Sequence, residues 1–464
     1  MRLIFILALF LAGCAPTIRE GAPLLNKVSP QKADSNPAVK PVTELPEMWW
    51  KAFNDPDLDR LVDLAMQGNP ALDEARDRLE EAQARTDESG ASLYPHVDSV
   101  SSFRRQRLSR NGNNDIYNGK TATIANVFPL FVNYNLDLWN RNGEIVSAAS
   151  ASEKATRAKY RQSALMLSSA VIKTYFALST AKNLAAIQAE IVRLSEEKTD
   201  LLDSAYRAGI RPKNIPVSAR ADLRKSKAVL AALHQRKETL NFALVELLGK
   251  TSEEEIRTAS TGIPERFGIP GRIDLDLLSK RPDVQAALWN VRRAAHLEKA
   301  AKAAFYPNIN LFALTGFNSI GISDLLGPGG ATYAYGPAID LPLFEGGALE
   351  GRLHEREAAY DEAVHAYNRI LLAAVRQIAD ALSAMRYGRQ KLDERTASVD
   401  LRNSETSIAR SGFQSGVSGK LPYLEAEIRL NKEKMAQMEE SLNWLYSITD
   451  AATALGGGFG RWPS

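Results

Sequence analysis

The amino-acid sequence contains one structural plan twice, and this repeat limits the possible folds more than any other feature. Anchor residues of the first copy recur in the same order 203 to 212 residues later. The spacing changes only where loops could lie, which is typical of tandem duplication of one supersecondary unit. The matched pairs are Asn69-Pro70 with Arg281-Pro282, Tyr94-Pro95 with Tyr306-Pro307, Asp137-Leu138 with Asp340-Leu341, Gly209 with Gly416, and Leu248-Gly249 with Leu455-Gly456.

Each copy reads as a helix, short alternating strands, a very long helix, a Gly/Pro break and a returning helix. The predicted fold class is therefore mainly α-helical, with one β-hairpin in each copy. The predicted parts are a signal peptide (1–13), an N-terminal tether (14–57), a first repeat (58–249, hairpin at about 97–138), a linker (250–272), a second repeat (273–458, hairpin at about 309–341) and a C-terminal tail (459–464).

The N-terminus has the pattern of a bacterial lipoprotein signal. Arg2 precedes an apolar run that is too short to span a bilayer, and small residues lead to Cys14, the single cysteine of the chain. We therefore expect Cys14 to be lipidated after cleavage, and a lone cysteine leaves no disulfide within the chain. Ala15 follows, where bacterial lipoproteins retained in the inner membrane commonly carry Asp, so we expect sorting to the outer membrane.

Two short segments alternate strictly between apolar and polar residues. In residues 130–138, Leu130, Val132 and Tyr134 share one face, and Asn133 and Asn135 share the other. Residues 332–341 repeat this pattern, and residues 97–106 and 309–317 are the expected hairpin partners. Period-two alternation predicts strands with one apolar and one polar face. Two ribbons packed on the helices of a soluble protein are the alternative to membrane strands. Aromatic residues at the strand ends favour the membrane: Tyr117, Trp139, Tyr333 and Tyr335.

The helix predicted after each hairpin is unusually long. Residues 143–208 contain no proline and no glycine after Gly143, so one helix of roughly 100 Å is expected at about 1.5 Å per residue. Because the offset between copies grows from 203 at the strand end to 207 at Gly416, we expect a four-residue stutter within the second long helix. Apolar residues at heptad spacing predict coiled-coil packing: Leu184, Ile187, Ile191, Leu194, Leu201 and Ala205, and Val364, Tyr367, Leu371, Ala374, Ile378, Ala381 and Met385.

Four strands per chain cannot close a barrel, and an open sheet cannot expose its edges to lipid. Closure requires several chains: two would form eight strands and three would form twelve. The polar strand faces would then line a lumen that the helices continue into the periplasm. The sequence thus indicates an oligomeric conduit.

Several segments together resemble the outer-membrane factor (TolC/OprM-like) family, in its NodT-type efflux lipoprotein branch. The resemblance covers essentially the whole mature chain. It implies a homotrimer in the outer membrane, with a 12-stranded barrel and an α-helical periplasmic tunnel, working with a periplasmic adaptor (membrane fusion) protein and an inner-membrane efflux pump. The segments are Met48–Leu58, Leu136–Trp139, Leu278–Val284, Tyr306-Pro307 and Leu455–Gly458.

The resemblance also implies a gate at the periplasmic end, where acidic side chains near the second reversal ring the aperture. Aligned on Gly416, that position is Glu425, whose three copies could repel one another and coordinate cations. The alternative is that Glu425 is an ordinary solvated helix residue. Grooves near Gly209 and Gly416 are the expected adaptor docking surface.

The sequence departs from the TolC-type gate at four positions. Phe413 stands where Tyr is common, Ser418 where Arg can occur, Pro422 at a second acidic site, and Ile215 where an acidic partner can sit. Because polar residues of a latch are missing, we expect the closed state to depend more on packing around Phe413 and Leu421.

No enzyme, cofactor or metal site is expected. The five histidines lack metal-ligand spacing, Gly456-Gly457-Gly458 lacks the Lys and Ser/Thr of a phosphate loop, and the net charge of +3 gives no general attraction to nucleic acid. The basic run Arg104-Arg105-Gln106-Arg107 is interpreted as an extracellular rim. The favoured function is passive exit of small toxic compounds. The alternatives are the outer-membrane channel of type I protein secretion and a non-channel coiled-coil scaffold lipoprotein.

Overall fold

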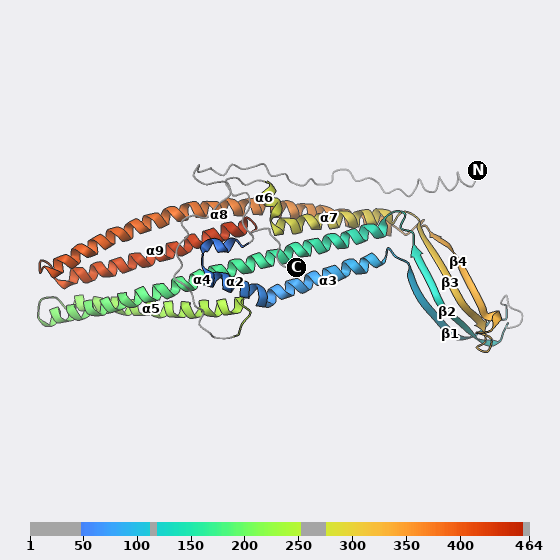
Figure 1. Ribbon diagram of the computed structural model, residues 1–464, viewed down its shortest axis with the longest axis horizontal. Coiled ribbons are helices and arrows are strands. Elements are labelled where there is room, and N and C mark those ends of the chain that lie inside the picture. The colour runs from blue at the N-terminus through green and yellow to red at the C-terminus, as the bar shows by residue number, and fades with distance from the viewer. Residues whose placement is uncertain (1–47, 112–117, 252–274, 458–464) are drawn as a thin grey trace. The chain divides into compact units, whose positions relative to one another are not determined.

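A computed structural model describes residues 48–111, 118–251 and 275–457 (Figure 1). The described chain is mainly helical with one four-stranded sheet, and each repeat supplies two strands and two long helices, which confirms the predicted fold class. Cys14, Tyr117 and most of the linker lie outside the described residues. The elements are η1 (Trp49–Phe53), α2 (Pro56–Gly68), α3 (Pro70–Ala91), β1 (His96–Arg107), β2 (Thr121–Asn135), α4 (Arg141–Arg207), α5 (Asn214–Leu247), α6 (Leu275–Lys280), α7 (Pro282–Ala303), β3 (Asn308–Ile320), η2 (Pro328–Gly330), β4 (Ala331–Asp340), α8 (Ala348–Gln414) and α9 (Lys420–Ala454).

The two long helices, α4 and α8, have the same length of 67 residues and begin and end 207 positions apart. The predicted stutter within the second helix is therefore wrong. The four extra residues lie before α8, which begins eight residues after Asp340, whereas α4 begins four residues after Asp137. The longer connection contains Pro342 and two glycines with positive φ, Gly346 (61°) and Gly347 (86°), which suit a loop and not a helix.

Heptad packing is confirmed in α8, where a buried side chain recurs every seven residues. Of the seven apolar residues predicted at heptad spacing in this helix, six are buried and Tyr367 is half-buried. In α4 the stripe shifts near its end, because Leu202 is buried and Leu201 is only half-buried. Such spacing keeps one helix face against its neighbours over many turns. The recurrent buried positions of α8 are Val364, Leu371, Ile378, Met385, Leu392, Val399 and Thr406.

The described chain divides into two compact units. The first contains residues 78–157 and 286–368, which include the whole sheet. The second contains the other described residues, which include α2, α5, α9 and the distal parts of α4 and α8. One 18-residue window of α4 is apolar enough to cross a bilayer, but 72% of it is buried inside the protein, as in a core helix.

In the second unit, the segment before α2 is anchored in the core. Trp49 and Trp50 are 1% and 2% exposed and Phe53 is also buried, so the end of the predicted tether is docked on the helices. Asp55 caps α2 by accepting the backbone N–H of Leu58, and its second carboxylate oxygen accepts the hydroxyl of Tyr175 from α4 at 2.6 Å.

A side chain at the start of each repeat caps the last helix of the same repeat. The Asn69 amide donates to the carbonyl oxygen of Leu247 at the end of α5 at 2.9 Å. At the matching position, the buried Arg281 guanidinium donates to the carbonyl oxygen of Ala454 in α9 at 2.5 Å. Both bonds satisfy carbonyl groups that a helix end leaves unpaired. The two repeats are thus closed in the same way by different chemistry.

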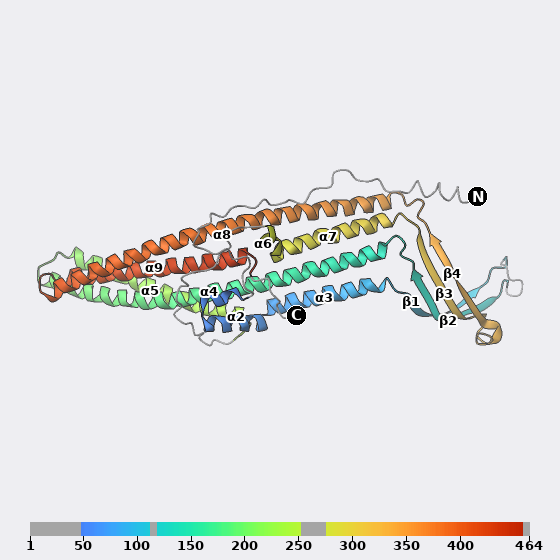
Figure 2. The same ribbon diagram turned by 45° about the horizontal axis from the view of Figure 1, so that its top comes forward.

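The first unit contains the sheet, in which β1, β2, β3 and β4 pair antiparallel in chain order (Figure 2). The strand predicted at residues 130–138 is wrong at both ends. The strand already begins at Thr121. The sequence pattern showed only its second part, because a register shift between Val127 and Leu130 interrupts the alternation. The strand ends at Asn135, because the carboxylate of Asp137 accepts the N–H groups of Asn142 and Gly143 and turns the chain into α4.

The strand register places the predicted apolar residues on one face. Val97, Val132, Ala313 and Tyr335 are cross-strand neighbours, so their side chains share that face. The other face carries Asn133, Asn135 and Asp340, again as predicted. Large apolar side chains on the first face are exposed to solvent: Val97 (62%), Leu130 (43%), Tyr333 (75%), Tyr335 (77%) and Ile339 (68%).

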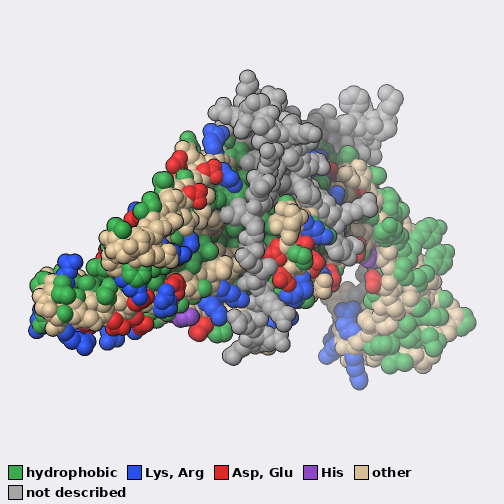
Figure 3. Space-filling model, turned by 60° about the vertical axis from the view of Figure 1, so that its left-hand side comes forward, with side chains coloured by type: hydrophobic (Ala, Val, Ile, Leu, Met, Phe, Trp, Pro, Cys, Tyr) green, Lys and Arg blue, Asp and Glu red, His purple; other side chains and the backbone are tan. Residues whose placement is uncertain are grey.

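Figure 3 shows the consequence for the surface of the sheet. On the side seen in that view, hydrophobic and uncharged side chains prevail over the sheet, whereas charged side chains of both signs are scattered over the helices. Exposed apolar side chains gathered in this way are typical of a surface that contacts a membrane or a partner.

Candidate functional site

The two helix reversals in the second unit have the same backbone geometry. Gly209 and Gly416 adopt φ values of 75° and 73°, a left-handed conformation that favours glycine. In the first reversal the N–H groups of Gly209 and Ile210 donate to Tyr206 and Ala205, and in the second those of Gly416 and Val417 donate to Phe413 and Gly412. These bonds resemble a Schellman motif, which ends each long helix and lets the chain return.

The second reversal carries a cluster of aromatic and charged side chains. Phe413 stacks on Tyr423 with ring centroids 6.1 Å apart and an interplanar angle of 1°. The guanidinium of Arg410 lies over the Tyr423 ring and donates to Glu427 at 2.7 Å. The hydrogen bond of Arg410 to Glu427 raises the pKa of Arg410 above its ordinary value, and its hydrogen bond to Tyr423 acts in the same direction. Arg410 therefore remains charged. Leu421 is half-buried in the first turn of α9.

At the matching positions of the first reversal, the ion pair has the opposite polarity. Asp203 of α4 accepts from Arg220 of α5 at 2.7 Å, whereas Arg410 of α8 donates to Glu427 of α9 at the same distance. Each pair joins the two helices of one repeat. The duplication has thus kept the contact and exchanged the charges.

Two further ion pairs join the repeats to each other, between α4 and α9. Lys198 of α4 contacts Glu425 of α9 at 2.8 Å, and the neighbouring Glu197 contacts Lys420 of α9. The side chain of Glu425 remains 38% exposed. These reciprocal pairs, which we call the cross-repeat latch, are polar links between the repeats that the sequence analysis did not anticipate.

The structure therefore brings Glu425 and Leu421 together with the Phe413 stack at one reversal, and it places Gly209 and Gly416 at the two helix ends, as the repeats predicted. Pro422 lies in the first turn of α9, where proline is tolerated because the helical N–H groups there have no partner. Only the tertiary structure shows Glu197, Lys198 and Lys420 as site residues. They are ordinary charges on a helix surface, over 200 positions from their partners in the chain.

The second reversal thus combines an aromatic stack with ion pairs that link α8 to α9 and α4 to α9. Within the described ranges, no group of three or more His, Cys, Asp or Glu side chains is arranged to hold a metal ion. Among the histidines, His296 contacts Glu144 at 2.5 Å and His354 contacts Glu357 at 3.2 Å, each as a link at a helix surface. Ion pairs between helices at a reversal can favour one of two helix arrangements over the other by a small free energy.

Comparison with known proteins identifies relatives over nearly the whole chain. The model of the family described as "Outer membrane efflux protein" matches residues 61–250 and 275–457. The multidrug resistance outer membrane protein MdtP of Escherichia coli strain K12 is 27% identical over 432 residues, which cover 89% of this chain and 87% of that protein. The putative multidrug resistance outer membrane protein MdtQ of the same strain is 25% identical over 98% of both chains.

Solved structures show the same fold. The outer membrane channel CmeC of Campylobacter jejuni superposes with a TM-score of 0.86 at 25% identity, covering 97% of this chain and 96% of that one. The outer membrane protein VceC of Vibrio cholerae gives a TM-score of 0.80 at 27% identity, covering 89% of this chain and 99% of that one.

Proposed function

The chain belongs to the outer membrane efflux protein family, and we propose that it forms, as a homotrimer, the passive exit duct of a tripartite efflux system. The observation that carries this proposal is the four-stranded sheet with an exposed apolar face and two edge strands, β1 and β4. In lipid such edges must be paired, and three chains would close a sheet of twelve strands. The polar face with Asn133 and Asn135 would then line the lumen.

The proposed partners follow from this role. A passive duct needs an inner-membrane pump as its source of energy and a periplasmic adaptor that joins the two. We place the adaptor at the reversals around Gly209 and Gly416, whose exposed residues include Ile210 (73%) and Val417 (85%). The cargo is proposed to be small toxic compounds, because the relatives MdtP and MdtQ are named for multidrug resistance.

Two measurements test the proposed function. Purified protein in a planar bilayer should conduct ions in discrete steps, whereas a coiled-coil scaffold lipoprotein would not. A strain lacking the gene should become more sensitive to a panel of toxic compounds and should secrete its proteins normally. Loss of one secreted protein with unchanged sensitivity would instead support a type I secretion channel.

The gate is proposed to lie at the second reversal. In a trimer, three copies of Glu425 could approach the axis, where like charges repel and attract cations. Within each chain the cross-repeat latch pairs Glu425 with Lys198 at 2.8 Å, so the same carboxylate would serve both as ring member and as latch. Stacking of Phe413 on Tyr423 and the half-buried Leu421 would support the closed state by packing.

Two neutral substitutions separate these two roles of Glu425. Both Glu425→Gln and Lys198→Gln break the latch and should raise single-channel conductance. Only Glu425→Gln should lower the preference for cations, because it removes three negative charges from the aperture. Conductance and reversal potential in a salt gradient measure both effects. Unchanged cation preference in Glu425→Gln would remove the ring, and unchanged conductance in both variants would remove the latch.

Cys14 lies outside the described residues, and its lipidation remains a proposal from the sequence. Cys14→Ser should abolish acylation, which intact-mass measurement of the mature protein would detect as the loss of the lipid mass. Cys14→Ala is the matched variant and should likewise lack the lipid mass. Fully acylated protein in either variant would contradict the lipoprotein assignment.

A further inference from the structure

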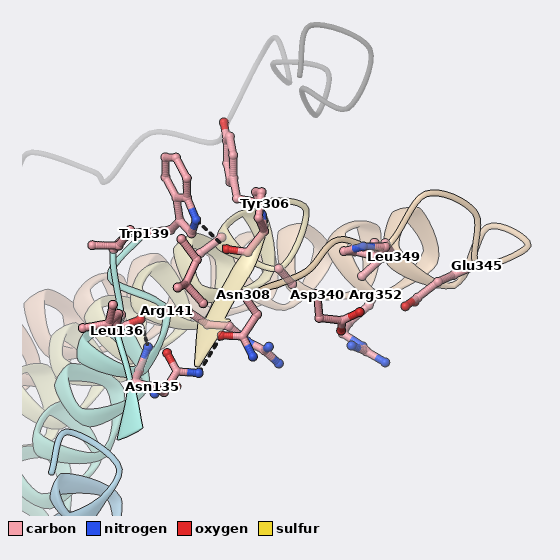
Figure 4. Close-up of a pocket in the computed structure, with 18 residues that line it drawn as sticks. Asn135, Leu136, Trp139, Arg141, Tyr306, Asn308, Asp340, Glu345, Leu349 and Arg352 are labelled. Atoms are coloured by element: carbon pink, nitrogen blue, oxygen red, sulfur yellow. Dashed lines mark hydrogen bonds between the residues drawn. The ribbon is translucent and has the colours of Figure 1, made fainter. Parts of the chain in front are cut away.

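A cavity of about 220 Å³ lies in the first unit, where the sheet meets the helices (Figure 4). Its walls come from the connections that follow β2 and β4 and from the end of α7. They include Arg141, Asp340, Glu345 and Arg352. This space is large enough to hold several water molecules or a small polar group.

Five charged side chains line this cavity, and one of them, Asp137, is used in the cap of α4. The other four are Arg141, Arg352, Asp340 and Glu345, whose side chains make no hydrogen bond or ion pair with another described residue. Asp340 lacks the capping role of Asp137 partly because the connection before α8 is longer than the connection before α4. Asp137 caps α4, whereas the matching Asp340 lies four residues further from its helix. Two cations and two carboxylates are thus available for one bound group.

A rigid aromatic pair lies at the same junction. Trp139 stacks on Tyr306 with ring centroids 4.8 Å apart and an interplanar angle of 22°. The indole N–H of Trp139 donates to the carbonyl oxygen of Pro307 at 2.7 Å, which fixes the ring. Figure 4 shows the two rings side by side at the top of the view, with the charged side chains below them. Such ring faces attract cationic groups.

The surroundings of the cavity are apolar and exposed. Leu343 and Phe344, in the connection between β4 and α8, are 67% and 91% exposed. Exposure of these apolar side chains to water is unfavourable in free energy, whereas acyl chains would cover them. A ligand of this site therefore combines a small zwitterionic group with hydrocarbon.

We propose that this junction cavity binds a phospholipid with a phosphoethanolamine headgroup, with the phosphate on Arg141 and Arg352 and the ammonium on Asp340, Glu345 and the aromatic pair. Guanidinium groups bind phosphate through charge-assisted hydrogen bonds, and a primary ammonium can donate to carboxylates. The inference rests on the proposed function, which places the junction at the periplasmic leaflet of the outer membrane.

Delipidated full-length protein in detergent is titrated with four probes, namely dihexanoyl phosphatidylethanolamine, phosphatidylglycerol, phosphatidylcholine and inorganic phosphate. Native mass spectrometry counts bound molecules, and calorimetry measures Kd. We expect one phosphatidylethanolamine per chain, bound about tenfold or more tightly than the other probes, because they lack a primary ammonium, an acyl chain or both. Equal affinity for phosphatidylglycerol, or for phosphate alone, would overturn the proposal.

Paired variants test the two halves of the site. Arg141→Gln with Arg352→Gln should weaken both phosphatidylethanolamine and phosphatidylglycerol about tenfold or more. Asp340→Asn with Glu345→Gln should weaken phosphatidylethanolamine alone. Arg104→Gln with Arg105→Gln, on exposed positions of β1 outside the cavity, is the matched control and should change neither affinity.

Bilayer conductance of the same preparations separates this inference from the proposed function. A conducting wild-type channel that binds no phosphatidylethanolamine would refute the lipid site and leave the function intact. The same result is expected if a second copy of the chain covers the cavity, and it would refute the lipid site in that case too. A protein that binds the lipid but never conducts would refute the duct.

Discussion

Replacement of Gly249 by alanine should destabilise the protein by about 3–5 kcal/mol. Gly249 follows α5 with a φ of 66°, where a side chain is strained. A Cβ there would overlap the carbonyl oxygen of Gly68 and come within 2.7 Å of its carbonyl carbon. Both obstacles are backbone atoms, so no rotamer change relieves the clash.

Gly209→Ala is the matched control for this prediction. Gly209 has a similar φ of 75°, but a Cβ there would meet no atom within 4 Å. It should therefore cost only the strain of the left-handed conformation, about 1–2 kcal/mol. Denaturant unfolding followed by circular dichroism compares the two. Equal losses would show that the close approach of Gly249 to Gly68 does not contribute to stability.

Reversal of both lysines of the cross-repeat latch should shift the channel strongly toward its open form. In Lys198→Glu with Lys420→Glu, each attraction becomes a repulsion against Glu425 and Glu197. Partly exposed pairs contribute about 0.5 kcal/mol each, so two pairs in each of three chains give about 3 kcal/mol. This corresponds to about a hundredfold change in the ratio of open to closed channels, which single-channel recording would show as a higher open fraction.

A charge-swapped variant distinguishes the latch from a general change of charge. Adding Glu197→Lys and Glu425→Lys to the two lysine reversals restores both attractions with opposite polarity, and the closed form should return. Arg85→Glu with Arg376→Glu makes the same change of net charge at exposed pairs within single helices. If that control opened the channel as strongly, the effect would come from the net charge and not from the latch.

The salt dependence offers a further check on the same physical cause. The latch side chains are between 26% and 39% exposed, so dissolved ions screen them in part. The open fraction of the unmodified channel should rise with ionic strength, whereas that of the lysine-reversed variant should fall. This opposite response is specific to an electrostatic latch.

Much of the architecture could be predicted from the sequence because it depends on local patterns. The duplicated anchors, the alternation around Leu130 and the heptads around Leu371 predicted the repeat order, the two-faced strands and the packed long helices. Gly209 and Gly416 predicted the reversals, since a left-handed residue is best supplied by glycine. The apolar strand face then indicated membrane strands. The unpaired strand edges led to the proposed assembly of several chains.

The errors and omissions arose where distant residues act on each other. The stutter was misplaced because an offset between two anchors cannot show whether extra residues lie in a helix or in the loop before it. The strand end at Asn135 depends on the cap that Asp137 supplies to α4, which competes with continued alternation. The sequence alone determined the elements and their faces, through periodicity that repeats over a few residues. Only the tertiary structure decided which charges meet, such as Lys198 with Glu425, because contacts between residues more than 200 positions apart leave no local pattern.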